Sequence, residues 1–272
     1  MERMIAKIRA GFALAVIAVT ALFLGLTQYL VLRTGITNPA SIPRCWHKIV
    51  LWALGIKVTV HGSIASRRPL MIASNHISWT DIMVLGSVAD VCFISKHELA
   101  GWPIFGSLAR LQRTVFVERD KKRKSGEQAG ELARRLAAGD AMVLFAEGST
   151  SDGNLILPFK STLFGAAEMA IRAGASDKVF VQPAAITYLR VHGMPMGRQH
   201  RTLAAWIGDA ELVPHLGTLL MEGAIDVDVH FGEPIEFTAA SDRKLVTREM
   251  EGNVRRMVAT ALRDARRPLV AR

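Results

Sequence analysis

Strand-like and helix-like segments alternate along the chain after residue 57, and this alternation constrains the fold more than any other feature of the sequence. Short apolar runs at 57–61, 70–73, 91–95, 115–118, 141–146, 179–186 and 226–231 are typical of strands. Apolar residues at helical spacing predict helices over 127–138, 162–173 and 243–263. Alternation of this kind favours one α/β domain with a mostly parallel or mixed central sheet flanked by helices.

The N-terminal segment has a different character, because residues 10–32 form a run of 23 residues without a charge between Arg9 and Arg33. At about 1.5 Å per residue, such a helix extends roughly 34 Å, which is enough to cross a membrane. A cleaved signal peptide is the alternative, but its apolar core would be only about 7–15 residues long. We therefore predict a retained N-terminal membrane-anchoring helix. Because both flanks are basic, the positive-inside rule does not fix its orientation, and a re-entrant helix stays open.

The segment 42–56 places Trp46 and Trp52 among basic and apolar residues. This pattern is typical of a helix that lies at a membrane interface, although an ordinary core helix with two tryptophans would look the same. We predict that residues 1–56 form the membrane anchor and that residues 57–272 form the globular domain.

The net charge of +10 and the pI near 10.1 indicate an anionic membrane surface or an acidic partner. Nucleic acid is disfavoured, since only 7% of residues are aromatic and the chain has no nucleic-acid-binding motif. The two cysteines, Cys45 and Cys92, form neither a disulfide framework nor a metal-ligand spacing, which fits a reducing compartment. We expect no metal site and no redox cofactor.

The segment Asn75-His76-Ile77-Ser78-Trp79-Thr80-Asp81 follows a predicted strand and places a histidine five residues before an aspartate. Imidazole can accept a proton near neutral pH, and a carboxylate on its other nitrogen fixes the tautomer and stabilises the cation. On one continuous helix the two side chains would lie about 140° apart. We therefore expect His76 in the loop, Asp81 in the first turn of a helix, and Ser78 as its N-cap. The alternative is that the segment is only a helix cap.

Polar residues also end two other predicted strands, at Arg119 and at Glu147-Gly148. Ligands of open α/β sheets bind at such carboxyl ends, so these residues are expected to converge with His76. The sequence contains no G-x-S-x-G, P-loop, G-x-G-x-x-G or H-E-x-x-H motif, which disfavours serine hydrolysis, nucleotide use and zinc proteolysis.

The chain resembles the glycerolipid acyltransferase family of lysophosphatidate acyltransferases over roughly residues 57–235. Four ordered blocks carry the resemblance: an H-x4-D block with His76 and Asp81, a block that ends at Arg119, an E-G block with Glu147 and Gly148, and an apolar block with Pro183. Arg113 stands where the family usually has glycine.

The resemblance implies a membrane-bound enzyme that moves a fatty acyl group from an acyl thioester, on acyl carrier protein or coenzyme A, to the hydroxyl of a lysolipid. His76 would act as the general base and Asp81 would orient it. Arg119, Glu147, Gly148 and Lys160 would bind the acceptor headgroup. The implied location is the inner, cytoplasmic membrane with the catalytic domain facing the cytoplasm, and the implied partners are membrane lipids and acyl carrier protein.

The third block departs from its common form F-P-E-G-T-R, because Ala146 replaces the proline and Thr150 replaces the arginine. Arginine presents a fork suited to phosphate, whereas threonine offers one uncharged hydroxyl. The stretches 147–154 and 157–161 resemble the bacterial lyso-ornithine lipid O-acyltransferases, whose acceptor has no phosphate. Lysophosphatidate stays open as the acceptor if Arg119 or Lys160 suffices, and so does a catalytically silent membrane-surface protein. The basic run at 119–124 fits either a solvated loop or a docking site for acyl carrier protein or lipid headgroups.

Overall fold

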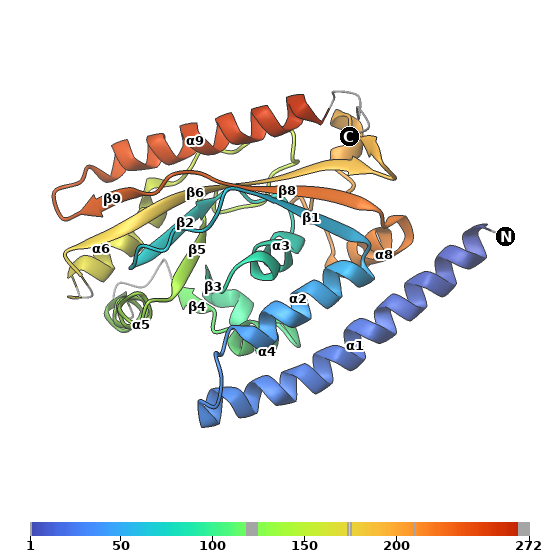
Figure 1. Cartoon of the computed structure of the whole chain (residues 1–272), viewed down its shortest axis with the longest axis horizontal. Coiled ribbons are helices and arrows are strands. Elements are labelled where there is room, and N and C mark those ends of the chain that lie inside the picture. Colours follow the sequence, from blue (N-terminus) through green and yellow to red (C-terminus); the bar gives the residue numbers. More distant parts are fainter. Residues whose placement is uncertain (1, 118–124, 173, 175, 209, 266–272) are drawn as a thin grey trace.

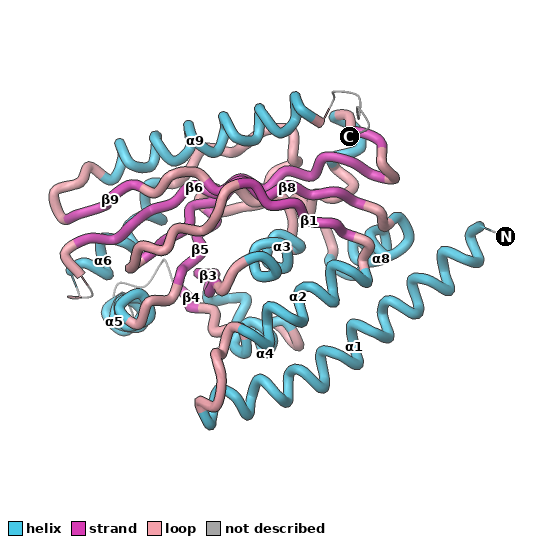
Figure 2. Tube along the Cα trace, in the orientation of Figure 1, coloured by secondary structure: helices cyan, strands magenta, loops and turns pink. Residues whose placement is uncertain are grey.

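The computed structural model describes residues 2–117, 125–172, 174, 176–208 and 210–265 (Figure 1). A central sheet runs through the molecule, and Figure 2 shows helices packed along both of its faces. Its strands are β1 (Ile56–His61), β2 (Leu70–Ser74), β3 (Val91–Lys96), β4 (Val115–Val117), β5 (Ala141–Phe145), β6 (Lys178–Val191), β7 (Met194–Pro195), β8 (Ile225–Phe231) and β9 (Ile235–Thr238).

The sheet is mixed, with strand order β1-β8-β6-β2-β5-β3-β4. Strands β2, β3, β4 and β5 pair in parallel, β6 joins β2 in parallel, and β8 lies antiparallel to β6. The register places Ser74 opposite both Phe145 and Ala184. The carboxyl ends of β2 and β5 therefore meet at one edge of the sheet, and the polar residues that follow them are brought together there.

Helices cover each face of the sheet over a separate core. The first core receives side chains from α1 (Glu2–Thr34), α2 (Ser41–Ala53), α3 (Thr80–Val88) and α8 (Leu212–Glu222), and the second from α5 (Ser125–Ala137), α6 (Gly165–Arg172) and α9 (Arg243–Asp264). Shorter helices are η1 (His97–Gly101), α4 (Phe105–Leu111), η2 (Ser161–Phe164) and α7 (Arg198–Arg201). Along β2, Leu70 and Ile72 enter the first core while Met71 and Ala73 enter the second. Burial of both faces explains why this strand reads as one continuous apolar run.

The long N-terminal helix is confirmed, and its segment Arg3–Thr34 has the length and mean hydropathy, 2.2, of a membrane-spanning helix. It lies along α2 rather than apart from the domain (Figure 1). Arg9 donates hydrogen bonds to the carbonyls of Met221 (2.6 Å) and Glu222 (3.0 Å) at the end of α8. The Gln28 side chain, 2% exposed, donates to the carbonyls of Pro39 and Leu111, each at 2.8 Å. These contacts hold α1 to the domain near both of its ends.

Residues before the predicted boundary at 56 also belong to the core that covers the sheet. Ala13 on α1 and Val50 and Leu51 on α2 are at most 3% exposed and pack in the first core. The two tryptophans of α2 differ, because Trp46 packs against this core whereas Trp52 is 66% exposed. The helix α2 therefore combines a core face with an outer face that carries an aromatic side chain.

The structure confirms the seven predicted strands and the predicted helices, with 162–173 divided between η2 and α6. The elements that were not predicted are η1, α4, β7, α7, α8 and β9. The strand β9 has only four residues, and α8 contains Pro214 and Gly217, which weaken a helical pattern.

Candidate active site

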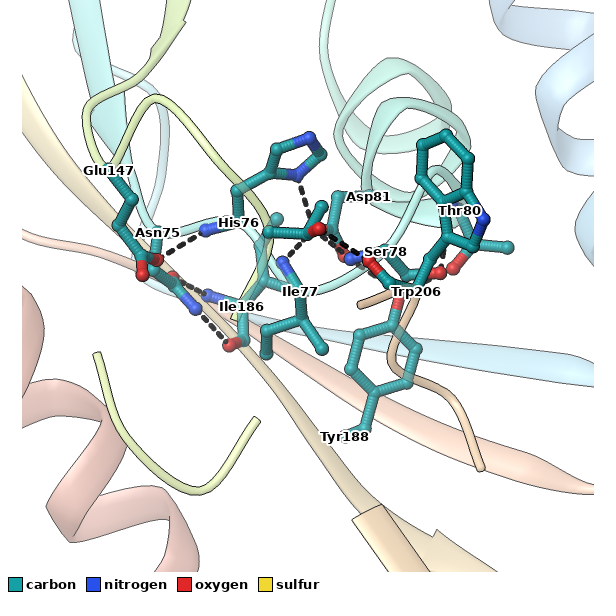
Figure 3. Close-up of polar contacts among 11 residues, drawn as sticks. Asn75, His76, Ile77, Ser78, Thr80, Asp81, Glu147, Ile186, Tyr188 and Trp206 are labelled. Atoms are coloured by element: carbon teal, nitrogen blue, oxygen red, sulfur yellow. Dashed lines mark hydrogen bonds and ion pairs between the residues drawn. The ribbon is translucent and has the colours of Figure 1, made fainter. Parts of the chain in front are cut away.

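A histidine and a carboxylate in contact with each other lie where β2 passes into α3. His76 follows β2 in the loop, Asp81 lies in the first turn of α3, and Nδ1 of His76 is 2.9 Å from Oδ2 of Asp81 (Figure 3). The sequence analysis predicted this placement. The prediction that Ser78 is the N-cap is wrong: Trp79 holds that position, and the Asp81 carboxylate accepts the backbone N–H groups that precede the helix.

The Asp81 carboxylate is fully buried and accepts hydrogen bonds on both oxygens. Oδ2 accepts from the backbone N–H of Ile77 (2.6 Å) and of Ser78 (2.9 Å) in addition to its contact with His76. Oδ1 accepts from the hydroxyl of Tyr188 at 2.8 Å. A buried charge is tolerated when it is hydrogen-bonded in this way. The orientation of the carboxylate beside the imidazole is therefore set by donors on both of its oxygens.

The His76 ring stacks on Phe145, with centroids 3.9 Å apart and an angle of 11° between the ring planes. A carboxylate cannot donate, so the shared proton is assigned to Nδ1 of His76, which leaves Nε2 as the basic nitrogen. The side chain is 18% exposed. The pair therefore has the geometry of a general base with its orienting group.

Contacts from β6 and from two loops fix the backbone around His76. The Asn75 side chain accepts from the N–H of Ile186 and donates to its carbonyl, both at 2.9 Å, so it prolongs the pairing of β2 with β6. Ser151 N–H donates to the His76 carbonyl (2.8 Å), and Trp206 N–H donates to the Ile77 carbonyl (2.9 Å). The loops after β5 and α7 are thus tied directly to the catalytic loop.

Glu147 differs from its predicted role as a ligand of the acceptor headgroup. The residue is 1% exposed, its Oε1 accepts from the backbone N–H of His76 (2.7 Å), and its Oε2 accepts from that of Leu157 (2.7 Å). Both oxygens are thus occupied by the protein itself, and the geometry gives Glu147 a positioning role. Burial raises the pKa of Glu147 to about 7, against the two N–H donors, which favour the charged form.

We expect Glu147→Gln to lower the free energy of unfolding by about 1–3 kcal/mol, because the amide nitrogen would face one of the two backbone donors. The effect should depend on pH. Because folding raises the pKa of Glu147, its carboxyl group stabilises the folded state at pH values below the ordinary pKa of glutamate. This contribution is lost as the pH rises through about 7. The gap in melting temperature between wild type and variant should therefore narrow between about pH 5 and about pH 8. A gap that widens over this interval would contradict the role assigned to the buried carboxyl.

Gly148 has a conformational role in the turn after β5. Its φ of +71° lies in the left-handed region, and a Cβ there would approach Cδ of Lys160 to 3.1 Å. Its N–H donates to the Phe145 carbonyl at 3.1 Å, so it is not free for the predicted headgroup contact. Lys160 is exposed and passes over this turn, which keeps its ammonium group accessible.

Arg119, the other predicted headgroup ligand, and the basic run 119–124 lie outside the described residues. The departure at Arg113 has a visible consequence, because this residue adopts a φ of 64°. A glycine would take that conformation without strain, which fits its usual presence in the family. Here Arg113 is held by an ion pair with Asp140 (2.6 Å) and by Arg135, which donates to its carbonyl (2.6 Å).

An apolar cavity of about 200 Å³ lies between the N-terminal helices and the site. His76 and Phe145 reach it from the strand ends, and much of its remaining wall comes from α1, α2, α3, η1 and α4, including Leu24, Gly25, Trp46, Phe105 and Leu108. The basic residue of the site therefore faces a space suited to a hydrocarbon chain.

Among the described residues, His61, Asp228 and His230 form a cluster with metal-ligating side chains. Nε2 of His61 is 2.7 Å from Oδ2 of Asp228, and the two imidazoles stack with centroids 4.2 Å apart at 10°. Because the two rings are nearly parallel, their nitrogen lone pairs lie in separate parallel planes and do not converge on one metal ion. The arrangement therefore fits a hydrogen-bonded cluster better than a metal site, and it belongs to β1 and β8 rather than to the His76 loop.

The fold and the site have the features of an α/β transferase, namely a histidine–aspartate pair at the strand ends beside an apolar cavity. Residues 57–187 match the family model described as Acyltransferase. The chain is 51% identical to the lyso-ornithine lipid O-acyltransferase of Brucella abortus, over 95% of this chain and 97% of that protein. It is 47% identical to the protein of the same name from Rhizobium meliloti, over 97% and 90% of the two chains.

A more distant relative is the 1-acyl-sn-glycerol-3-phosphate acyltransferase of Neisseria meningitidis, which is 30% identical over 77% of this chain and 78% of that protein. The crystal structure of the 1-acyl-sn-glycerophosphate acyltransferase PlsC from Thermotoga maritima superposes with a TM-score of 0.62 at 20% identity, over 96% and 97% of the two chains. The latter match concerns the fold. The chain belongs to the acyltransferase family that contains the lyso-ornithine lipid and 1-acyl-sn-glycerol-3-phosphate acyltransferases, and it is a lysolipid acyltransferase.

Proposed function

We propose that the protein transfers a fatty acyl group from an acyl thioester to the hydroxyl of lyso-ornithine lipid. The observation that carries the reaction is the His76–Asp81 pair, whose histidine lines the apolar cavity. Support for lyso-ornithine lipid as the acceptor comes from two relatives named lyso-ornithine lipid O-acyltransferase, which match nearly the whole chain.

The geometry suggests one sequence of proton transfers. Nε2 of His76 takes the hydroxyl proton while the alcohol oxygen attacks the thioester carbonyl carbon, and Asp81 stabilises the imidazolium. When the tetrahedral intermediate collapses, the carbon–sulfur bond breaks and the thiolate receives the proton from Nε2. The products are an ester and a free thiol. Because the acceptor is itself the nucleophile, no acyl-enzyme is required.

Thr150 bears on the choice of acceptor because it stands next to the catalytic loop. Its hydroxyl donates to the carbonyl of Trp206, and the adjacent Ser151 donates to that of His76. The side chain at this position thus links two loops of the site and carries no charge. An acceptor without phosphate would not require a cation here, which supports lyso-ornithine lipid over lysophosphatidate.

We expect the wild-type protein to prefer lyso-ornithine lipid about ten- to a hundredfold, since a charge-assisted contact is worth roughly 1.5–3 kcal/mol. Thr150→Arg should narrow this preference. The measurement is a competition between the two acceptors for one acyl thioester, with the products identified by mass spectrometry. Thr150→Val is the matched control, because it also loses the Trp206 contact but gains no charge. If the wild type formed phosphatidate preferentially, lyso-ornithine lipid would be ruled out as the preferred acceptor. The proposed acyl-transfer reaction would still stand.

A basic groove supports acyl carrier protein as the donor. It has a volume of about 1020 Å³ and shares Thr114 with the apolar cavity. Its charged and titratable lining consists of one acidic residue, Glu131, and five basic residues, His97, Arg110, Arg113, Arg134 and Arg135. Asp140 pairs with Arg113 and Arg135. In the part of the chain that the structure describes, neither Arg110 nor Arg134 pairs with a carboxylate, so both remain available to an acidic carrier surface.

The double variant Arg110→Glu, Arg134→Glu should raise KM for acyl carrier protein thioesters by about tenfold or more while changing KM for the coenzyme A thioester less. The new glutamates would repel an acidic carrier surface, and salt screens this repulsion, so the effect should diminish at high salt. The double variant Arg248→Glu, Arg256→Glu at exposed positions of α9 is a charge-matched control outside the groove. Unchanged KM for the carrier thioester would rule out this groove as its docking site.

We further propose that the protein is held at the cytoplasmic face of the inner membrane by α1. The outward side of this helix exposes large apolar residues, among them Phe12, Leu22, Phe23, Leu26 and Leu30. Trp52 on α2 is exposed beside it, as expected of an aromatic side chain at the headgroup level.

A further inference from the structure

We propose that Tyr188 is a positioning residue for proton transfer, with a hydroxyl group that aims the Asp81 carboxylate at His76. Tyr188 lies on β6 and is absent from the His-x4-Asp motif, yet its hydroxyl is 2.8 Å from Oδ1 of Asp81 (Figure 3). The residue is 2% exposed. The contact is therefore made deep in the core, where solvent cannot replace it readily.

The directions of the hydrogen bonds around Tyr188 follow from the chemistry of the groups. A carboxylate can only accept, so the single phenolic proton of Tyr188 is donated to Asp81. Thr80 lies 2.6 Å from the phenolic oxygen, and its hydroxyl must then donate to it. Thr80, Tyr188 and Asp81 thus form a one-directional chain of donors that ends at the carboxylate.

The two oxygens of Asp81 are supported unequally, which gives Tyr188 its importance. Oδ2 contacts His76 and accepts two backbone N–H groups, whereas Tyr188 is the donor that the described residues provide to Oδ1. Loss of the hydroxyl would leave a buried anionic oxygen without this partner, and the carboxylate could relieve that cost by rotating. Rotation would move Oδ2 away from Nδ1 of His76. Burial and the Asp81 charge raise the pKa of Tyr188 well above its ordinary value, so the donor stays protonated.

Tyr188→Phe removes the donor and little volume. We expect kcat to fall about tenfold, because misplaced catalytic groups lower rates steeply, while KM for acceptor and thioester stays near wild type. We also expect the acid limb of the pH–rate profile to move to lower pH. A carboxylate that has rotated away from Nδ1 stabilises protonated His76 less, so the base loses its proton at a lower pH.

Thr80→Val is the matched control, since it removes one buried hydroxyl of the same chain but leaves the contact between Tyr188 and Asp81. It should lower the melting temperature to a similar degree and move the acid limb much less. Wild-type kcat and an unmoved limb in Tyr188→Phe would overturn the proposal. An equal displacement of the limb in Thr80→Val would also overturn it, because loss of packing would then explain both variants.

A spectroscopic test keeps the proposal falsifiable if Tyr188→Phe does not fold. The chain contains two tyrosines, Tyr29 and Tyr188, so fluorotyrosine incorporated into a Tyr29→Phe background reports Tyr188 alone. Its ¹⁹F resonance should move when Asp81→Asn is introduced, but not in Thr247→Val on α9. A ¹⁹F chemical shift that is unchanged in Asp81→Asn would refute the proposed contact. The proposal rests on acyl transfer but not on the acceptor, and this measurement needs no turnover, so its failure is distinct from failure of the proposed function.

Discussion

His76→Ala should lower acyl transfer by about 10²–10⁴ while the protein remains folded, because the substitution removes the general base from a loop. The structure strengthens this expectation. Nδ1 of the ring is engaged with Asp81 at 2.9 Å, so Nε2 is the nitrogen left to accept the hydroxyl proton. Turnover should be measured with saturating lysolipid and thioester, with thermal unfolding as the check on the fold.

A matched histidine distinguishes loss of the base from general damage. His192 is half-exposed in the turn between β6 and β7, away from the cavity, and His192→Ala should turn over like the wild type. If folded His76→Ala turned over at the wild-type rate, His76 would be excluded as the base. The reaction would then have to proceed by another group in the same fold.

Asp81→Asn should also cause a large loss of activity, but by a different route and with little effect on the fold. The Ile77 and Ser78 N–H groups fix an acceptor at the position of Oδ2, so the amide oxygen should take that place and keep Nδ1 of His76 protonated. The tautomer of the base is thereby retained. What is lost is the negative charge that stabilises the imidazolium, and we expect a fall in kcat of about 10²-fold or more.

The control for Asp81→Asn is Asp81→Ala, which removes the acceptor as well as the charge. Two backbone donors and Tyr188 would then face an empty site, so this variant should be clearly less stable than Asp81→Asn. A melting temperature near wild type combined with poor turnover in Asp81→Asn separates catalysis from helix capping. Near-normal turnover in that variant would show that charge on Asp81 is dispensable.

The sequence predicted the sheet and the histidine–aspartate pair because both depend on local pattern. Apolar runs such as 70–73 are short, continuous and bounded by turn residues, and a five-residue spacing leaves few ways for His76 to meet Asp81. The contact of Tyr188 with Asp81 could not be predicted in this way. The two residues are 107 positions apart, and they meet because β6 pairs with β2 in a register that sequence periodicity does not reveal.

Glu147 and Gly148 show a second limit of sequence analysis. Their motif placed them beside His76, and the structure agrees on the place. A motif does not indicate the direction of a side chain, however, and here the carboxylate turns inward to two backbone N–H groups. The same holds for Gly148, where a left-handed backbone rather than an open surface explains the residue type.

The attachment of α1 by Arg9 and Gln28 has a practical consequence for anyone who handles the protein. Four residues of this helix line the cavity beside His76, so the apolar helix forms part of the cavity wall: Ala21, Leu24, Gly25 and Gln28. Trimming it to obtain a more tractable sample, or exchanging it for an unrelated anchor, would open that wall even if the rest of the domain folded. Purification should therefore preserve the complete N-terminus in a lipid-like environment.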